Sequence, residues 1–85
     1  MGEGTIIITV RLTPASPEAL GGIKKEMEKM TVIALAEEPI GFGLNALVAK
    51  LTIPDRGGEQ DKLEERLNKL KGVGSFEILS ATRAM

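Results

Sequence analysis

The chain has 85 residues, of which 42% are hydrophobic and 27% are charged, a composition typical of a globular protein with room for one modest core. Because cysteine and histidine are both absent, disulfide frameworks, zinc sites built from those ligands and imidazole catalysis are excluded, which disfavours an enzyme and favours an intracellular location. A formal net charge of −1 disfavours direct binding of nucleic acid, and the apolar run after Glu3 is too short for a signal peptide or a membrane span. We therefore expect one soluble, cytoplasmic domain over residues 1–85 without a cofactor.

The first two predicted elements are a strand and a helix. Residues 5–12 predict a strand, because every second residue forms one apolar, inward face made of Ile6, Ile8, Val10 and Leu12. The next segment predicts a helix that starts near Ser16 as its cap, has Pro17 in its first turn and ends at about Met30. Gly21 and Gly22 interrupt this helix, so either its first turn frays or its backbone packs closely on a sheet. The inward positions of the helix are Leu20, Ile23, Met27 and Met30.

The middle of the chain predicts two strands separated by a loop. Residues 31–35 are β-branched enough for a second strand, and residues 36–43 are irregular enough for a loop. Alternation resumes over residues 44–53, which predicts a third strand that ends at the turn residues 54–58.

The last part of the chain predicts a second helix and a fourth strand. Residues 59–71 have acids early, lysines late and Gly72 just after the end, with Leu63, Leu67 and Leu70 inward. A strand over residues 73–81 and a short tail over residues 82–85 follow. The order β-α-β-β-α-β predicts a ferredoxin-like α+β sandwich, a four-stranded antiparallel sheet with two helices on one face.

The segment around Phe42 is the most unusual local feature. Phe42 is one of two aromatic residues, and Gly41 and Gly43 flank it in the predicted loop. It fits an exposed anchor for a partner protein, because glycines allow close approach and buried aromatics dominate interface energies. The alternative is that Phe42 folds back onto the sheet as core while the glycines form a bulge or a tight turn, and the residues alone favour that alternative.

Acidic residues cluster at Glu37 and Glu38 and again over residues 59–65. Neither spacing favours a cation site, because adjacent acids point in different directions and an acidic first helical turn complements the helix dipole. We interpret both clusters as solvated surface. The Gly41-x-Gly43 pattern precedes a strand and lacks a further glycine, so it is not a phosphate-binding loop, and residues 54–58 are interpreted as an ordinary turn.

Several segments together support a resemblance to a known family. They are residues 37–55 (EEPIGFGLNALVAKLTIPD), 57–58 (GG), 61–67 (DKLEERL), 72–78 (GVGSFEI) and 82–85 (TRAM). In these segments the chain resembles archaeal elongation factor 1-beta, over residues 5–85. Residues 38–44 are the most specific part, similar to a loop shared with the catalytic C-terminal domain of the eukaryotic exchange factors. The resemblance implies a guanine nucleotide exchange factor that opens the GTP-binding domain of elongation factor 1-alpha and promotes GDP release and GTP reloading.

The resemblance also implies which residues contact that partner. Phe42 matches the family's loop phenylalanine, which implies insertion into an apolar pocket beneath the nucleotide site. Arg83 matches a cationic residue, a lysine in the eukaryotic relatives, that reaches toward the magnesium site. We expect Phe42 to be exposed and Arg83 to lie near the same end of the sheet. The expected partner-binding residues are Pro39, Ile40, Gly41, Phe42, Gly43 and Arg83.

Other functions share this fold class. The main alternative is a small-molecule-binding regulatory module that dimerises edge to edge. An RNA-binding sheet would expose stacking aromatics, whereas this chain has only Phe42 and Phe76. An acylphosphatase-like enzyme would have an arginine-bearing phosphate loop after the first strand, where residues 14–16 have no arginine.

Overall fold

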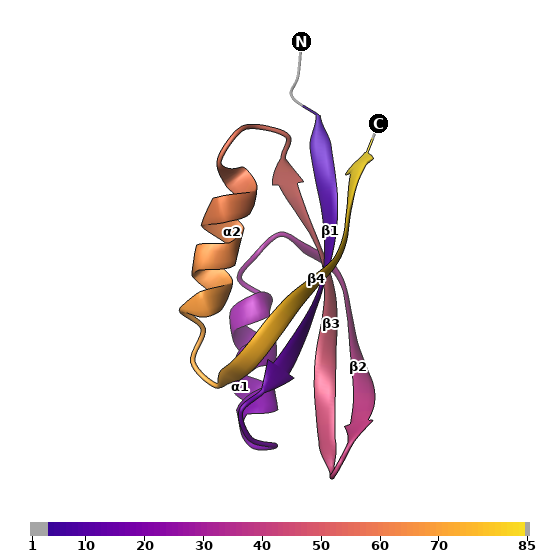
Figure 1. The fold of residues 1–85 in the computed structure, drawn as a ribbon, viewed down its shortest axis with the longest axis vertical. Coiled ribbons are helices and arrows are strands. Elements are labelled where there is room, and N and C mark those ends of the chain that lie inside the picture. Colours follow the sequence, from indigo (N-terminus) through magenta and orange to yellow (C-terminus); the bar gives the residue numbers. More distant parts are fainter. Residues whose placement is uncertain (1–3, 85) are drawn as a thin grey trace.

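A computed structural model describes residues 4–84, which form six elements in the order β-α-β-β-α-β (Figure 1). This order confirms the predicted ferredoxin-like α+β fold. Residues 1–3 and 85, which the expected domain includes, lie outside the described residues. The elements are β1 (Thr5–Pro14), α1 (Ala19–Met27), β2 (Val32–Gly41), β3 (Leu44–Pro54), α2 (Glu59–Asn68) and β4 (Val73–Ala84).

The four strands form one antiparallel sheet in the order β2-β3-β1-β4. The central strands are therefore β3 and β1, and the edge strands are β2 and β4. Both helices lie on one side of this sheet (Figure 1). The start of β1 and the end of β4 lie at one end of the sheet, and the turn between β2 and β3 lies at the other.

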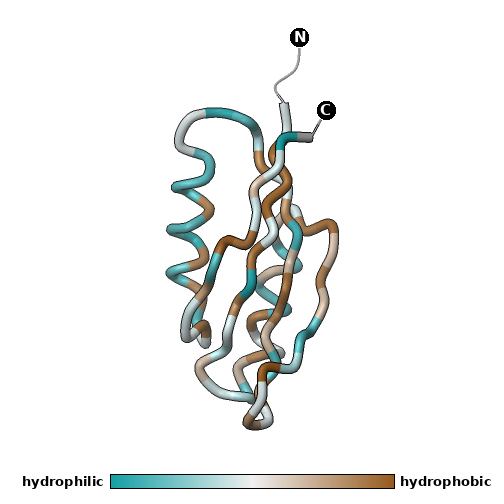
Figure 2. The backbone as a smooth tube through the Cα atoms, turned by 45° about the vertical axis from the view of Figure 1, so that its right-hand side comes forward, coloured by the Kyte–Doolittle hydropathy of each residue, from teal (hydrophilic) through white to brown (hydrophobic). Residues whose placement is uncertain are grey.

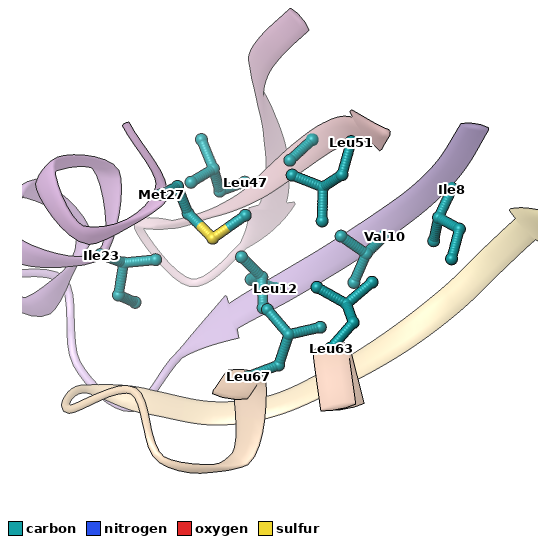
Figure 3. Packing of buried hydrophobic residues seen from close by; sticks show 10 residues of the cluster. Ile8, Val10, Leu12, Ile23, Met27, Leu47, Leu51, Leu63 and Leu67 are labelled. Carbon is teal, nitrogen blue, oxygen red and sulfur yellow. The ribbon is translucent and has the colours of Figure 1, made fainter. Parts of the chain in front are cut away.

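The hydrophobic core lies between the sheet and the two helices. Ile8, Val10 and Leu12 of β1 are fully buried at alternate positions, as the period of two predicts. Figure 3 shows side chains of both helices converging on those of the sheet. Figure 2 shows that hydrophilic residues gather along α2 and the loop before it. The other large buried residues are Ile23 and Met27 of α1, Leu47 and Leu51 of β3, and Leu63 and Leu67 of α2.

Helix α1 is shorter than predicted. It begins at Ala19 and ends at Met27, whereas the pattern predicted an end at Met30. The residue in the N-cap position is Glu18, whose side chain makes no capping bond, and the backbone carbonyl of Ser16 accepts the amide of Ala19 at 3.1 Å. The first turn is therefore closed by backbone atoms rather than by the predicted serine cap.

The glycine pair inside α1 is not explained by close packing. A Cβ atom added at Gly21 or at Gly22 would meet nothing within 4 Å apart from the chain neighbours and the helix backbone. Both positions are exposed and helical, so each glycine lowers helix stability by about 1 kcal/mol relative to alanine.

Strand β2 is longer than predicted, because residues 36–41 belong to it instead of to a loop. They pair with β3 as far as Gly41 opposite Leu44, so that Phe42 and Gly43 alone form the turn. Glutamate and proline disfavour the strand conformation. Pairing with the neighbouring residues of β3 outweighs that preference here. Pro39 is tolerated because β2 is an edge strand.

Strand β4 also extends beyond its predicted end. It continues past Ala81 to Ala84, and residues 82–84 pair with residues 5–7 of β1. Arg83 therefore lies within a strand, opposite Ile6, and not in a free tail. Met85, the last residue of the predicted tail, lies outside the described residues.

Candidate functional site

The turn between β2 and β3 is a tight two-residue turn with unusual backbone angles. Phe42 has φ of 55° and Gly43 has φ of 75°. Positive φ at both central residues is characteristic of a type I′ hairpin turn, whose twist matches that of the flanking strands. Glycine adopts this conformation freely, but a bulky residue in the left-handed region costs about 1–2 kcal/mol. Phe42 is therefore held in a conformation that its own backbone disfavours.

The side chain of Phe42 projects fully into solvent. Its relative exposure is 103%, and that of Ile40, two residues earlier, is 39%. The prediction that Phe42 is exposed is confirmed, and the alternative that it folds back into the core is wrong. The glycine part of that alternative is correct, since Gly43 does form a tight turn. An aromatic ring at the tip of a hairpin is a surface that a complementary apolar pocket can bury.

The hairpin projects beyond the rest of the sheet. Pairing between β1 and β3 stops at Leu12 opposite Leu47, whereas pairing between β2 and β3 continues to Gly41 opposite Leu44. Residues 38–46, here named the hairpin arm, thus form a two-stranded ribbon at the end of the sheet away from the start of β1 (Figure 1).

Glu37 lies at the base of the hairpin arm and binds groups on two elements. Lys24 Nζ of α1 donates to Glu37 Oε2 at 2.8 Å, and Asn45 Nδ2 of β3 donates to Glu37 Oε1 at 3.2 Å. These two hydrogen bonds, the one from Lys24 first, lower the pKa of Glu37 below its ordinary value of 4.5. The same contact with Glu37 raises the pKa of Lys24.

Glu38, the next residue, is bound on the opposite face of the sheet. Arg11 Nη1 of β1 donates to Glu38 Oε1 at 3.2 Å, and Arg11 Nη2 donates to Glu77 Oε1 of β4 at 2.6 Å. Hydrogen bonds to Glu77 and then to Glu38 raise the pKa of Arg11. The interpretation of Glu37 and Glu38 as solvated surface agrees with their exposure. The structure adds that each glutamate is also engaged in an ion pair.

Arg83 lies at the other end of the sheet. In the sheet it pairs with Ile6 of β1, and Ile6 pairs on its other side with Ile53 of β3. Ile53 is nine residues beyond Leu44 along β3, and at about 3.3 Å per residue the two ends are about 30 Å apart. The prediction that Phe42 and Arg83 share one end of the sheet is wrong. Pairing of β4 with β1 holds Arg83 where β1 begins.

The guanidinium of Arg83 is engaged in an exposed ion pair. Its Nε lies 2.7 Å from Asp55 Oδ2, in the turn that follows β3, and the side chain of Arg83 is 73% exposed. Asp55 is in turn held by its backbone amide, which donates to the carbonyl of Gly4 at 2.9 Å. This end of the sheet therefore presents a largely accessible cation that already has one carboxylate partner.

The hollows between the helices do not resemble a small-molecule site. One, of about 160 Å³, lies between Met30, β3 and α2 and is smaller than the roughly 300 Å³ typical of ligand pockets. Another, of about 500 Å³, is lined by Gly22, Glu26, Lys69, Leu70 and Lys71, which are mostly charged. Among residues 4–84 we find no group of three or more carboxylates placed to hold a metal ion.

The residues that support the hairpin arm were not identified from the sequence. Arg11, Lys24 and Asn45 had no predicted role, and the two glutamates were assigned to a loop. Adjacent residues of a strand point to opposite faces, so a strand assignment for residues 36–41 would have placed the glutamates on different faces.

None of the helices in the described part of the chain is long and apolar enough to cross a membrane.

The family match and the similar relatives point to the same family. Residues 9–84 match the family described as the EF-1 guanine nucleotide exchange domain. The chain is 41% identical over 85 residues to elongation factor 1-beta of Methanoculleus marisnigri, covering 93% of this chain and 96% of the relative. It is 32% identical over 88 residues to elongation factor 1-beta of Methanothermobacter thermautotrophicus, covering 96% and 99%. The protein of the same name from Sulfolobus acidocaldarius is 38% identical over 76 residues, covering 87% and 80%.

Proposed function

The chain belongs to the family of the EF-1 guanine nucleotide exchange domain, and from this premise we propose that it acts on elongation factor 1-alpha by contacting that GTPase at two separate points. It is a guanine nucleotide exchange factor of translation elongation. The proposed place of action is the cytoplasm, and the proposed acting unit is one exchange domain over residues 1–85. The observation that supports the two contacts is the separation of Phe42 from Arg83 by about 30 Å.

The first contact is the anchor at the hairpin arm. Phe42 is fully exposed at the tip, and Ile40 adds apolar surface beside it. A ring of this kind is stabilised when an apolar pocket of the partner removes it from water. Pro39, Gly41 and Gly43 complete the segment that approaches the GTPase. In this arrangement the arm supplies affinity and orientation.

The second contact is the cation at the other end of the sheet. The two ends are too far apart for both to reach one nucleotide site, so their chemistry decides which one does. Mg²⁺ at a phosphate site is held by oxygen ligands, and a guanidinium binds the same carboxylate and phosphate groups whereas a phenyl ring does not. Arg83 is therefore the group that competes for the ligands of the ion. Phe42, which the resemblance would place beneath the nucleotide site, is proposed to enter an apolar pocket farther from the ion.

This function needs no covalent chemistry of the chain. An exchange factor works by binding the nucleotide-free GTPase more tightly than the nucleotide-bound form. Reversing a 99:1 population requires a difference of about 5.5 kcal/mol. The anchor contributes about 2 kcal/mol or more of binding free energy in both nucleotide states. The difference between the states therefore has to come from contacts that form only when the ion is displaced.

The test follows the release of a fluorescent GDP analogue from the cognate elongation factor 1-alpha as the concentration of the factor is raised. We expect Phe42→Ala to raise the half-saturating concentration, because the anchor contributes binding. We expect Arg83→Gln to lower the maximal rate instead, because it removes the competitor for the ion. Excess Mg²⁺ should slow release driven by the wild-type chain more than release driven by Arg83→Gln.

Matched controls use exposed residues away from the two contacts. Ile33→Ala removes an apolar side chain that is 58% exposed on β2, and Arg66→Gln removes an exposed cation of α2. Both should behave as the wild type does. A well-folded wild-type chain that leaves GDP release unchanged would reject the proposed partner, and tight binding of free RNA would favour the RNA-binding alternative.

A further inference from the structure

We infer that Glu37 and Glu38 are positioning residues that fix the direction of the hairpin arm and thereby the place of Phe42. They are adjacent in β2, yet they are bound on opposite faces of the sheet by side chains of different elements. This inference rests on the exchange function proposed above. It assigns to the two acids a role in that function without any contact between them and the partner.

The hairpin arm needs support because of its shape. Beyond Leu47 strand β1 no longer pairs with β3, so the arm consists of two strands only. Two-stranded ribbons twist more strongly than wider sheets and are marginally stable by themselves. A register shift between Pro39 and Gly41 interrupts the pairing near the tip. An unsupported ribbon of this kind would place the ring of Phe42 in a range of directions.

Glu37 braces the arm on the face that the helices cover. Its two carboxylate oxygens bind separate groups, Lys24 of α1 at 2.8 Å and Asn45 of the arm at 3.2 Å. Asn45 lies opposite Pro39 on β3. Glu37 thus connects the returning strand of the arm to the helix layer, which is anchored in the core through Ile23.

Glu38 braces the arm on the opposite face. It is the first residue of the arm, and it binds Arg11, which lies on the central strand β1 and also binds Glu77 of β4. The guanidinium therefore connects the arm to both β1 and β4. The planar guanidinium of Arg11 donates hydrogen bonds in fixed directions, so it can bind two carboxylates at once and hold both in place.

The two braces together restrict the arm in both directions perpendicular to the sheet. A brace on one face alone would leave the ribbon free to bend toward the other face. A ring that is already in place loses less conformational freedom when it enters a pocket. Glu37 and Glu38 should therefore affect the affinity for the GTPase through Phe42, while leaving the maximal rate of GDP release unchanged.

The double variant Glu37→Gln with Glu38→Gln tests this inference in the GDP-release assay. We expect the half-saturating concentration to rise by about five- to tenfold, with the maximal rate retained. The matched control is Asp61→Asn with Glu65→Gln, which removes two negative charges from α2 and should leave both parameters unchanged. Thermal unfolding of each variant verifies that it is folded at the assay temperature.

A double-mutant cycle with Phe42→Ala separates positioning from direct contact. If the glutamates act through Phe42, the double variant should have no further effect once the ring is absent. A full additional effect in that background would mean that the acids bind the partner themselves, which would overturn the inference. An unchanged half-saturating concentration, with wild type active and Phe42→Ala impaired, would overturn it too. That outcome would leave the proposed exchange function intact.

Exchange of the two charges offers a rescue. Lys24→Glu and Glu37→Lys should each raise the half-saturating concentration, because each places two like charges together. The combined variant restores an ion pair at the same place and should return the value to within about twofold of the wild type. A combined variant as impaired as either single variant would contradict the role of this pair.

Discussion

The two ends of the sheet present opposite kinds of chemistry. The hairpin end exposes an aromatic ring on a turn of two residues, and the charged groups near it are engaged in ion pairs at the base of the arm. The other end exposes the cation Arg83, which is paired with Asp55 beside the start of β1. One end is built to hold an apolar group in place, and the other holds a charge that can change partners.

This difference separates affinity from release. An apolar anchor gains free energy by leaving water whatever the nucleotide state of the partner, so by itself it does not favour the empty GTPase. A cation that takes the ligands of a bound ion gains only where the ion is displaced. We therefore expect variants at the two ends to change different parameters of exchange, and the following predictions test that division.

The largest effect is expected for Phe42→Ala. Removing the anchor should raise the half-saturating concentration about 30-fold, which corresponds to about 2 kcal/mol of binding free energy. The free energy of unfolding should not fall, because the ring is fully exposed. Titration of the GTPase and chemical denaturation measure the two quantities. A large loss of stability would mean that the ring supports the fold, and the assignment of Phe42 to binding alone would then be wrong.

A smaller effect is expected for Gly43→Ala, which compares the turn with the start of α2. Gly43 and Gly58 have φ of 75° and 87°, and a Cβ at either would meet nothing within 4 Å. Alanine at either position should lower the free energy of unfolding by about 1 kcal/mol. Gly43→Ala should also raise the half-saturating concentration, whereas Gly58→Ala should leave it unchanged, because Gly58 lies in the turn beside Asp55 and far from the hairpin arm. Equal losses of exchange in both variants would point to stability as the sole cause.

Asp55→Asn sharpens the comparison at the charged end. The Asp55–Arg83 ion pair is exposed, so its loss should change the free energy of unfolding by less than about 1 kcal/mol. Arg83 would then have no competing carboxylate in the turn and should reach its ligands on the GTPase more readily. We expect the maximal rate of GDP release to rise by about twofold. A lower maximal rate would show instead that Asp55 holds Arg83 in its working position.

The smallest effect is expected on acidification of the free chain. The pKa of Glu37 is lowered, first by Lys24 and then by Asn45, and Glu28 is a further acid near Lys24. Because the folded state lowers this pKa, the contribution of Glu37 to stability is complete above its ordinary value of 4.5 and is lost as the pH falls below it. The protection of the arm amides, measured as their hydrogen-exchange rates relative to those of an unstructured chain at the same pH, should therefore fall in this acidic range in the wild type. Glu37→Gln should lack that part of the change.

Most of the fold follows from the alternation of apolar residues. The inward positions of β1 and of both helices were predicted correctly, because burial of one face determines which residues are apolar. The errors lie where pairing with a neighbouring strand outweighs local preference. Residues 36–41 became part of β2 despite Glu37, Glu38 and Pro39, because β3 continues beside them. Residues 82–84 became part of β4 because β1 begins opposite them.

The site was only partly predictable for the same reason. The glycines beside Phe42 indicated a tight approach, and the exposure of the ring followed from the family resemblance. The distance between Phe42 and Arg83 depends on the register of three strands, which no local pattern contains. The braces at Glu37 and Glu38 depend on that register as well, since they join residues that are 13 and 27 positions apart in the chain.

The left-handed conformation of Phe42 bears on how this chain changes under selection. Asparagine or glycine fills such a turn position without the strain of a bulky side chain, so Phe42→Asn or Phe42→Gly should stabilise the fold by about 1 kcal/mol. Activity and thermal stability thus favour different residues at one position, a trade-off known for functional sites generally. A laboratory evolution experiment that ranks variants by melting temperature alone would be expected to lose the anchor early. One that ranks them by GDP release would keep the phenylalanine and find its stabilising substitutions elsewhere, for instance at the exposed glycines of α1.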